Sequence, residues 1–296
     1  MKRIKNRTLV VVLLGFLISV FSSFTINAEE QGIVRIGGST TLLPIIATCA
    51  MNFMDKYSTW DQVDPAFPKS QVLLFVTGGG SGFGVKALMN DTVHIGLISR
   101  DLKESEKSQL GNFQTILVGK DALAIAANKN TPLKRKNNFT TEEVANIFSG
   151  GAKTFKDVVS TAPKKEIILL VRDAGAGSAE IFQEKVMGKA QVSPRALQMP
   201  SQGALLQKLE AKNESIAYIS SGLVSQNQKL VAFDLDGVAP TNQNVINGTY
   251  KLSRPLYMVI KGTPNPLMKA FINYVLTEGQ KIVAELAYVP VNAVQK

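Results

Sequence analysis

One local pattern occurs three times in this sequence and limits how the chain can fold. In each copy an apolar, strand-forming run enters a turn rich in glycine and hydroxyl residues, and a helix-compatible stretch follows. The three copies span residues 34–54, 72–89 and 167–187. Strands that alternate with helices in this way are typical of an α/β protein with a mostly parallel sheet.

The turn of each copy is suited to an anion. Glycine lets backbone amides approach a ligand closely, and a helix N-terminus leaves amides unpaired at the positive end of its dipole. Ser39 and Ser81 could instead act only as helix caps, because serine is a preferred N-cap. Three helix N-termini that converge on one point would form a site of uncharged donors for a small oxyanion.

Residues 1–28 have the parts of a cleavable signal peptide. Four lysines and arginines precede an apolar core at residues 9–21, and Ala28 is a small residue suited to cleavage. The core is shorter than the ~20 residues of a membrane span, so we expect export to a periplasmic or secreted location. The only cysteine, Cys49, lies well beyond this core, so a lipoprotein signal and an intramolecular disulfide are not expected.

Composition excludes several functions. The formal net charge is +10, but the basic residues are scattered and form no patch with aromatic residues of the kind that binds nucleic acid. One histidine and one cysteine cannot form a thiolate or imidazole metal cluster. The glycines at 78–84 are not followed by the Gly-Lys-Ser/Thr of a nucleotide-binding loop, and Phe83 stands where a serine-nucleophile elbow needs glycine. We therefore expect no cofactor, no metal and no enzymatic activity.

The remaining elements follow the same alternation. Strands are expected at residues 94–99, 115–118, 121–128, 216–219 and 256–260, and helices at 104–109, 201–211, 266–276 and 279–287. Thr140 and Glu143 form a capping box for a helix through residue 148, and residues 234–248 are rich in turn residues. Ligands of such sheets bind at the carboxyl ends of the strands, where the three turns and Arg100 lie.

The order of elements indicates two α/β units. The C-terminal strand and helices are too few to fold alone, so we expect them to return to the first unit. Residues 29–120 and 250–296 would then form lobe I and residues 121–249 lobe II. Two crossings between lobes would leave a cleft, and hinged closure of a cleft is one way to trap a small ligand.

Seven segments resemble one family in their order and spacing: IGGSTTLLP, TGGGSGFGVKAL, HIGLISRDLKESE, TEEVANIFSG, VRDAGAGSAEIF, GVAPTNQNVINGTYKLSRPLY and EGQKIVAELAYVPV. That family is the extracytoplasmic phosphate-binding proteins of phosphate ABC importers (PstS-like). The resemblance implies a two-lobed type 2 periplasmic-binding-protein fold, with crossings near Asp121 and near residues 250–254. It also implies inorganic phosphate and the membrane permease subunits of an ABC importer as partners, and we expect a monomer.

The resemblance also implies which residues bind phosphate. Matched motif by motif, they are Ser39, Thr40, Thr41, Ser81, Gly82, Ser99, Arg100, Arg172, Ala176, Gly177 and Ser178. The fourth loop departs from the usual GSGT of the family, so that Ala176 lacks a hydroxyl but keeps its amide. The alternative for the two arginines is surface pairing with Asp101 or Asp173.

One further departure concerns selectivity. Some phosphate-binding proteins with a related site have aspartate where Arg100 stands, and a carboxylate there can accept the proton that phosphate carries and sulfate lacks. Asp101 and Asp173 remain as candidate acceptors in this chain. His94, the only histidine, is expected to be structural. Another tetrahedral oxyanion (sulfate, molybdate, tungstate) or an exported phosphatase stay open as alternatives.

Overall fold

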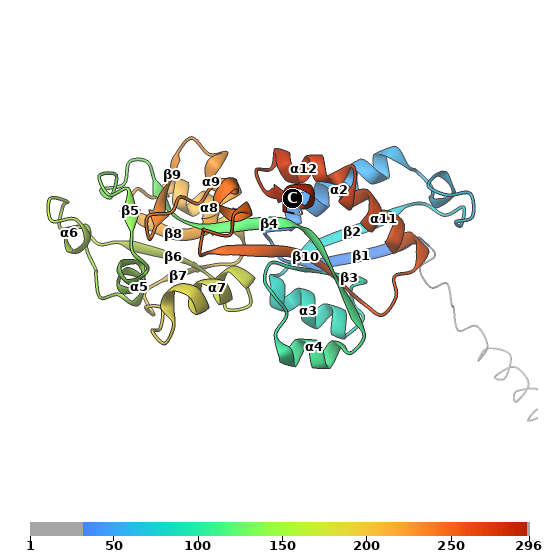
Figure 1. Cartoon of the computed structure of the whole chain (residues 1–296), viewed down its shortest axis with the longest axis horizontal. Coiled ribbons are helices and arrows are strands. Elements are labelled where there is room, and N and C mark those ends of the chain that lie inside the picture. Colours follow the sequence, from blue (N-terminus) through green and yellow to red (C-terminus); the bar gives the residue numbers. More distant parts are fainter. Residues whose placement is uncertain (1–31, 295–296) are drawn as a thin grey trace, which may run out of the picture.

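The computed structural model, which describes residues 32–294, is an elongated α/β structure built on one sheet of 11 strands (Figure 1). The strands are β1 (Ile33–Gly38), β2 (Leu73–Gly78), β3 (Ile95–Ile98), β4 (Phe113–Asn128), β5 (Asn138–Phe139), β6 (Ile168–Arg172), β7 (Leu197–Met199), β8 (Ser215–Ser220), β9 (Leu230–Leu235), β10 (Ser253–Lys261) and β11 (Val289–Pro290). The expected signal peptide, residues 1–28, lies outside the described residues.

Helices cover the sheet at both ends of the molecule, and most of them follow a strand directly. They are α2 (Leu43–Lys56), α3 (Ser81–Met89), α4 (Glu104–Leu110), α5 (Thr141–Ser149), α6 (Phe155–Val158), α7 (Gly177–Phe182), α8 (Gln202–Ala211), α9 (Ser221–Ser225), α10 (Asn242–Ile246), α11 (Pro266–Leu276), α12 (Gly279–Glu285), α13 (Val291–Val294), the 3-10 helix η2 (Trp60–Gln62) and the π-helix η3 (Gln183–Met187). No helix in the described part of the chain has the length and apolar character that a membrane crossing requires.

The sheet has two parallel ends joined by antiparallel strands. Along its main path the order is β2-β1-β3-β10-β4-β8-β6-β7. β1 pairs in parallel with β2 and β3, and β6 pairs in parallel with β8 and β7. Between these ends, β10 and β4 run side by side in opposite directions through the middle of the molecule (Figure 1). Within the sheet, β4 and β10 are the strands that connect the two halves.

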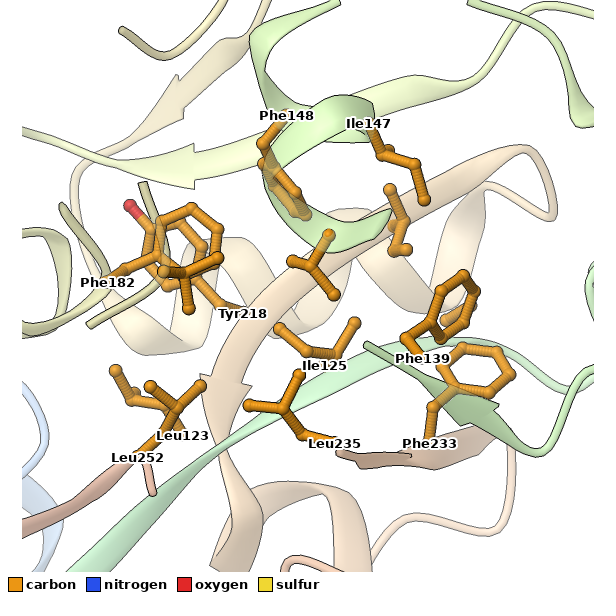
Figure 2. Packing of buried hydrophobic residues seen from close by; sticks show 14 of the residues in the cluster. Leu123, Ile125, Phe139, Ile147, Phe148, Phe182, Tyr218, Phe233, Leu235 and Leu252 are labelled. Carbon is orange, nitrogen blue, oxygen red and sulfur yellow. The ribbon is translucent and has the colours of Figure 1, made fainter. Parts of the chain in front are cut away.

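The two largest hydrophobic clusters divide along the same line. One takes its buried residues from positions 34–118 and 256–288, and the other from positions 122–252 and Val289. Figure 2 shows part of the second, in which the rings of Phe182 and Tyr218 stack with centroids 4.0 Å apart and Phe148 packs edge-on against Phe182. Each half therefore has a hydrophobic core of its own.

Most predicted elements are present, with two clear differences. The strands predicted at 115–118 and 121–128 are one strand, β4, of 16 residues. It continues through Gly119, where an added Cβ would lie 2.5 Å from the carbonyl oxygen of Val289, and the register shifts opposite it between Leu256 and Tyr257. Such an irregularity bends a long strand without ending it.

The second difference is that the strands β5, β7, β9 and β11 were not predicted; β9, with six residues, is the longest of them. Leu230 and Phe233 of this strand are buried, and β9 pairs with both β4 and β5. The capping box is confirmed: the Glu143 amide donates to Thr140 Oγ1 at 3.1 Å, and the Thr140 amide donates to Glu143 Oε2 at 2.8 Å.

Candidate anion-binding site

The three predicted turns meet between the two halves of the molecule. Each follows the carboxyl end of a strand, β1, β2 or β6. Arg172 Nη1, at the end of β6, donates to Thr40 Oγ1, after β1, at 3.0 Å. The Gly82 amide, at the start of α3, donates to the Gly175 carbonyl oxygen at 3.0 Å. The convergence predicted from the sequence is therefore observed.

Arg172 is the first of two arginines at this meeting point, and its side chain is 2% exposed. Besides Thr40, its guanidinium donates to the carbonyl oxygens of Met199 (2.9 Å) and Pro200 (3.1 Å), and it pairs with Asp173 Oδ2 at 3.2 Å. Burial lowers the pKa of Arg172, the positive charge of Arg254 lowers it further, and Asp173 only partly offsets both. The guanidinium is therefore a buried cation that a further negative charge would stabilise.

Arg254 of β10 is the second arginine, and it was not among the predicted site residues. Its Nη2 donates to Thr41 Oγ1 at 3.0 Å, and its Nη1 lies 3.4 Å from Ser99 Oγ. Asp121, directly opposite on β4, pairs with it: Oδ2 accepts from Nε at 3.1 Å and from Nη2 at 2.7 Å. The signal in the sequence was an arginine at the start of an otherwise apolar strand, because a buried charge requires a partner.

Hydroxyl groups complete the site. Ser81 Oγ accepts from the Ser99 amide at 3.0 Å and lies 3.2 Å from Ser99 Oγ. A Cβ on Gly177 would come within 2.9 Å of Ser99 Oγ, so glycine is required for this close approach. The buried side chains of Thr40, Thr41, Ser81, Ser99, Arg172 and Arg254 are called the hydroxyl–guanidinium cluster below.

Gln202, at the first turn of α8, joins this cluster to Ser178. Its Nε2 donates to Ser178 Oγ at 3.4 Å, and its amide donates to Thr40 Oγ1 at 3.4 Å. Its Oε1 accepts from the Ser220 amide at 3.3 Å, and Ser220 Oγ donates to Asp121 Oδ1 at 2.9 Å. Gln202 and Ser220 were also missed, because glutamine and serine before or after an apolar stretch carry no distinctive pattern.

The serines of the turns differ in whether they cap a helix. The N-cap residues of α2, α3 and α7 are Leu42, Gly80 and Ala176, and none of them caps its helix with a side chain. Ser81 is the first residue of α3, and its hydroxyl faces Ser99 instead. Ser39 Oγ accepts from the Thr41 amide at 3.2 Å within its own turn. The cap alternative is therefore wrong for Ser81, whereas Ser39, whose carbonyl oxygen also accepts from the Leu43 amide at 3.0 Å, makes the contacts of a cap.

Several backbone amides expected to face the ligand are already hydrogen-bonded. The Ser39 amide donates to the Leu97 carbonyl oxygen at 2.7 Å, and the Ala176 amide donates to that of Asp173 at 3.0 Å. The Gly82 amide is engaged with Gly175, as described above. The Ala176 amide, which the departure from GSGT leaves in place, thus donates within its own turn. The donors that the cluster presents are chiefly hydroxyls and guanidiniums.

Arg100 lies outside the cluster although it follows Ser99 directly. Its Nη1 and Nη2 donate to the two carboxylate oxygens of Glu106, each at 2.7 Å, and its Nε lies 3.0 Å from Glu180 Oε2. Glu180 also pairs with Lys103 at 2.6 Å. The pairing is not with the side chain of Asp101, and Arg100 is buried rather than on the surface. We call this group, Arg100, Lys103, Glu106 and Glu180, the carboxylate network.

The two carboxylates considered as acceptors of a phosphate proton differ in position. Asp101 is exposed, and its Oδ1 accepts from Tyr257 at 3.5 Å. Asp173 lies beside the cluster and pairs with Arg172. Asp121, whose side chain is 0% exposed, is the fully buried carboxylate among residues 32–294 and was not predicted as an acceptor.

The geometry offers no histidine to the cluster. His94 immediately precedes β3, and its Nδ1 accepts from the Arg35 amide on β1 at 3.1 Å. Because β1 and β3 are parallel, His94 lies at the opposite edge of the sheet from Ser99 and the first turn. Among residues 32–294, no three histidine, cysteine, aspartate or glutamate residues gather where they could hold a metal ion.

Comparison with known proteins agrees with this architecture. A family described as the PBP superfamily domain matches residues 25–278. The phosphate-binding protein PstS of Staphylococcus epidermidis is 27% identical over 274 residues, which cover 88% of this chain and 79% of that protein.

Solved structures extend the comparison. A substrate-binding protein of a phosphate ABC transporter from Clostridium perfringens, as its structure with bound phosphate is described, superposes with a TM-score of 0.75 at 29% identity, covering 88% of this chain and 99% of that one. A phosphate transport receptor of the ABC type from Vibrio cholerae gives 0.67 at 25% identity, covering 86% and 99%. The chain belongs to the PBP superfamily and has the two-lobed type 2 periplasmic-binding-protein fold.

Proposed function

We propose that this protein captures inorganic phosphate and delivers it to an ABC importer. The observation that carries the proposal is the hydroxyl–guanidinium cluster, in which two buried arginines from different strands each donate to one of two consecutive threonines, Thr40 and Thr41. Guanidinium groups and hydroxyls are the donors that suit the oxygens of a tetrahedral anion. The bound phosphate in the Clostridium perfringens relative and the names of the Staphylococcus relatives favour phosphate among such anions.

The proposed contacts follow from the positions of the side chains. Residues proposed to bind phosphate are Ser39, Thr40, Thr41, Ser81, Ser99, Arg172, Gly177 and Ser178. The Gly82 and Ala176 amides are hydrogen-bonded within the protein, so we propose that these residues hold the turns before α3 and α7 close together. Arg100 is not included, because its two carboxylate partners would repel an anion.

A hydroxyl that accepts from an arginine keeps its own hydrogen for another partner. Thr40 accepts from Arg172 and Thr41 from Arg254, so both threonine hydroxyls remain able to donate to a ligand. The positive charge behind each hydroxyl strengthens it as a donor, since hydrogen bonds in a chain polarise one another. A small oxyanion would therefore meet hydroxyl donors that buried arginines polarise.

The site would lie in a cleft between two lobes. We propose lobe I as residues 29–120 and 250–296 and lobe II as residues 121–249. The two largest hydrophobic clusters support this division, except that Tyr250, Leu252 and Val289 pack in the cluster of lobe II. The contact of Arg172 with Thr40 would then join the lobes. Small-angle scattering with and without phosphate tests this: we expect a smaller radius of gyration with ligand, and an unchanged value at saturation would contradict closure.

The proposed function also implies where the protein works and with which partner. We propose that residues 1–28 direct export and that the mature protein works outside the cytoplasm as a monomer, with permease subunits as its membrane partner. The basic n-region and apolar core support the first point. Intact-mass analysis of the exported protein would show whether cleavage follows Ala28.

Calorimetric titration tests the central proposal. The protein is stripped of anions by unfolding and refolding, then titrated with phosphate, sulfate, molybdate and tungstate. We expect one phosphate per chain and tighter binding than for the other three. Tighter binding of another oxyanion would change the assigned ligand, and a lack of binding by all four would overturn the proposal.

Phosphatase activity is the alternative of a different class. It would require a base beside a serine, and His94 lies at the other edge of the sheet. A phosphomonoester turnover assay with the same preparation is expected to show no hydrolysis above that of the buffer.

A further inference from the structure

We propose that Arg254 is a second phosphate-binding arginine and that Asp121 is the residue that positions it. The inference rests on the proposed function and adds to it a charged ligand and its support. It starts from the position of Arg254 at the crossing between the halves, where its side chain and that of Asp121 are each 0% exposed.

The donors of Arg254 divide between two directions. Nε and one side of Nη2 face Asp121 Oδ2, at 3.1 and 2.7 Å. Nη2 also faces Thr41 Oγ1 at 3.0 Å, and Nη1 faces Ser99 Oγ at 3.4 Å. The contact to Ser99 is long for a hydrogen bond of this kind. An oxygen of an anion would be a better partner for Nη1 than this hydroxyl, because hydrogen bonds between two charged groups are shorter and stronger.

Asp121 has no capacity left to bind the ligand itself. An ionised carboxylate has about four acceptor positions. Oδ2 accepts twice from Arg254, and Oδ1 accepts from Ser220 Oγ at 2.9 Å with Ser221 Oγ at 3.5 Å. Asp121 therefore acts through Arg254: it balances the buried charge and fixes the plane of the guanidinium, so that Nη1 and Nη2 point at the third strand end and the first turn.

The second arginine changes what the site can recognise. Arg172 and Arg254 approach the cluster from β6 and β10, and their charges are close enough that Arg254 disfavours the charged form of Arg172. An anion between them would relieve this repulsion. With Asp121 saturated, the described site offers two cations and hydroxyls, so the acceptor for a phosphate proton would be a hydroxyl oxygen, Asp173 or a backbone carbonyl rather than Asp121.

Arg254→Lys tests the direct contact, with Arg100→Lys as the matched control. Both arginines are buried and paired with carboxylates, but only Arg254 faces the hydroxyls. Lysine keeps the charge and can still reach Asp121, yet it cannot make the fork that also reaches Thr41 and Ser99. We expect the Kd for phosphate to rise at least about tenfold in Arg254→Lys and to change less than about threefold in Arg100→Lys.

Asp121→Asn tests the positioning role through a double-mutant cycle. If Asp121 acts through Arg254, the substitution weakens phosphate binding in the wild type but adds little in the Arg254→Lys background. We expect Asp121→Asn to lower the melting temperature both in the wild type and in Arg254→Lys. A loss of stability alone would therefore not produce a binding effect confined to the wild type. Equal, additive losses of binding in both backgrounds would overturn the positioning role.

A crystal structure of the wild-type protein with phosphate gives a second measurement that needs no variant to fold. We expect Nη1 or Nη2 of Arg254 within about 3.2 Å of a phosphate oxygen. Phosphate held by Arg172 alone, or unchanged affinity in a folded Arg254→Lys, would overturn this inference and leave the proposed function intact. Absence of phosphate binding by the wild type would instead overturn both.

Discussion

The hydroxyl–guanidinium cluster and the carboxylate network each bury arginine side chains near the end of β3, yet they offer them to different partners. Arg172 and Arg254 donate to the hydroxyls of Thr40 and Thr41. Arg100 donates to both oxygens of Glu106 and lies against Glu180. A hydroxyl can turn its hydrogen toward an incoming anion, whereas a carboxylate repels it.

The pKa values of Arg100 and Arg172 are shifted in opposite directions, because their neighbours differ in charge. Burial lowers the pKa of Arg100, but its hydrogen bond to Glu106 and the charges of Glu180 and Glu106 outweigh burial and leave the pKa raised. Burial likewise lowers the pKa of Arg172, and there the nearby Asp173 does not outweigh it. Two carboxylates thus fully compensate the charge of Arg100, whereas the charge of Arg172 is compensated only in part and can still be stabilised by an anion.

The largest expected effect separates the two regions directly. Arg172→Ala removes up to two hydrogen bonds to an anion, each worth roughly 1.5–3 kcal/mol, so we expect phosphate affinity to fall at least about a hundredfold. Arg100→Ala is expected to change the Kd less than about threefold while lowering the melting temperature by several degrees, because it leaves two carboxylates short of a partner. Calorimetry and thermal melts on both variants check this. A large loss of phosphate affinity in Arg100→Ala would show that Arg100 is part of the binding site.

Within the site, the hydroxyl of Ser178 should matter less than the guanidinium of Arg172. Ser178→Ala removes a hydroxyl that accepts from Gln202 Nε2 at 3.4 Å and can donate its own hydrogen to an anion. We expect about tenfold weaker phosphate binding, which corresponds to ~1.4 kcal/mol. The same titration, at matched folding stability, makes the comparison. Equal losses in Ser178→Ala and Arg172→Ala would show that Arg172 is not a ligand.

The variant Asp173→Asn tests whether the carboxylate of Asp173 makes Arg172 a weaker ligand for an anion, as we expect Glu106 to do for Arg100. Asp173 Oδ2 lies 3.2 Å from Arg172 Nη2, and the Asp173 side chain is 37% exposed. In Asp173→Asn we expect phosphate and sulfate both to bind roughly threefold more tightly, because a partly exposed negative charge next to the anion is removed. Competition titration at pH 6 and 8 measures both anions. Weaker binding of phosphate alone would instead identify Asp173 as the acceptor of the phosphate proton.

The smallest expected effect concerns the carboxylate network and pH. Burial by itself raises the pKa of Glu106, but hydrogen bonds from Arg100 and the Lys103 amide outweigh it and hold the pKa below its ordinary value of 4.5. The unfolded chain therefore binds a proton more readily, and the stabilisation, complete above pH 4.5, is lost as pH falls through the lower folded-state pKa.

Thermal melts between pH 5 and 3 measure this loss. Glu106→Gln is expected to make the melting temperature fall less steeply with acid than in the wild type. Glu104→Gln on the same helix, where the side chain is 88% exposed, serves as the control and should follow the wild type. Identical slopes for all three proteins would show that the Arg100–Glu106 pair does not titrate as described.

The repeated strand–turn–helix pattern was sufficient to predict much of the fold. The predicted segment 34–54 overlaps β1 and α2, and the predicted segment 72–89 contains β2 and α3, because apolar runs and glycines mark such elements locally. β9 was missed, and β4 was predicted as two strands, because pairing with neighbours far along the chain overrides the local signal of a turn.

The sequence by itself determined which residues carry the donors: three turns with serine and threonine at strand ends, and Arg172 at the end of β6. Periodicity and the conformational freedom of glycine are local properties, so they can be read from neighbouring residues. The tertiary structure decided which arginines serve the turns, since Arg100 meets Glu106 and Glu180, while Arg254, 133 residues from Asp121, meets Thr41 and Ser99. A guanidinium takes its function from the charges around it, and those come from elements that only the folded sheet brings together.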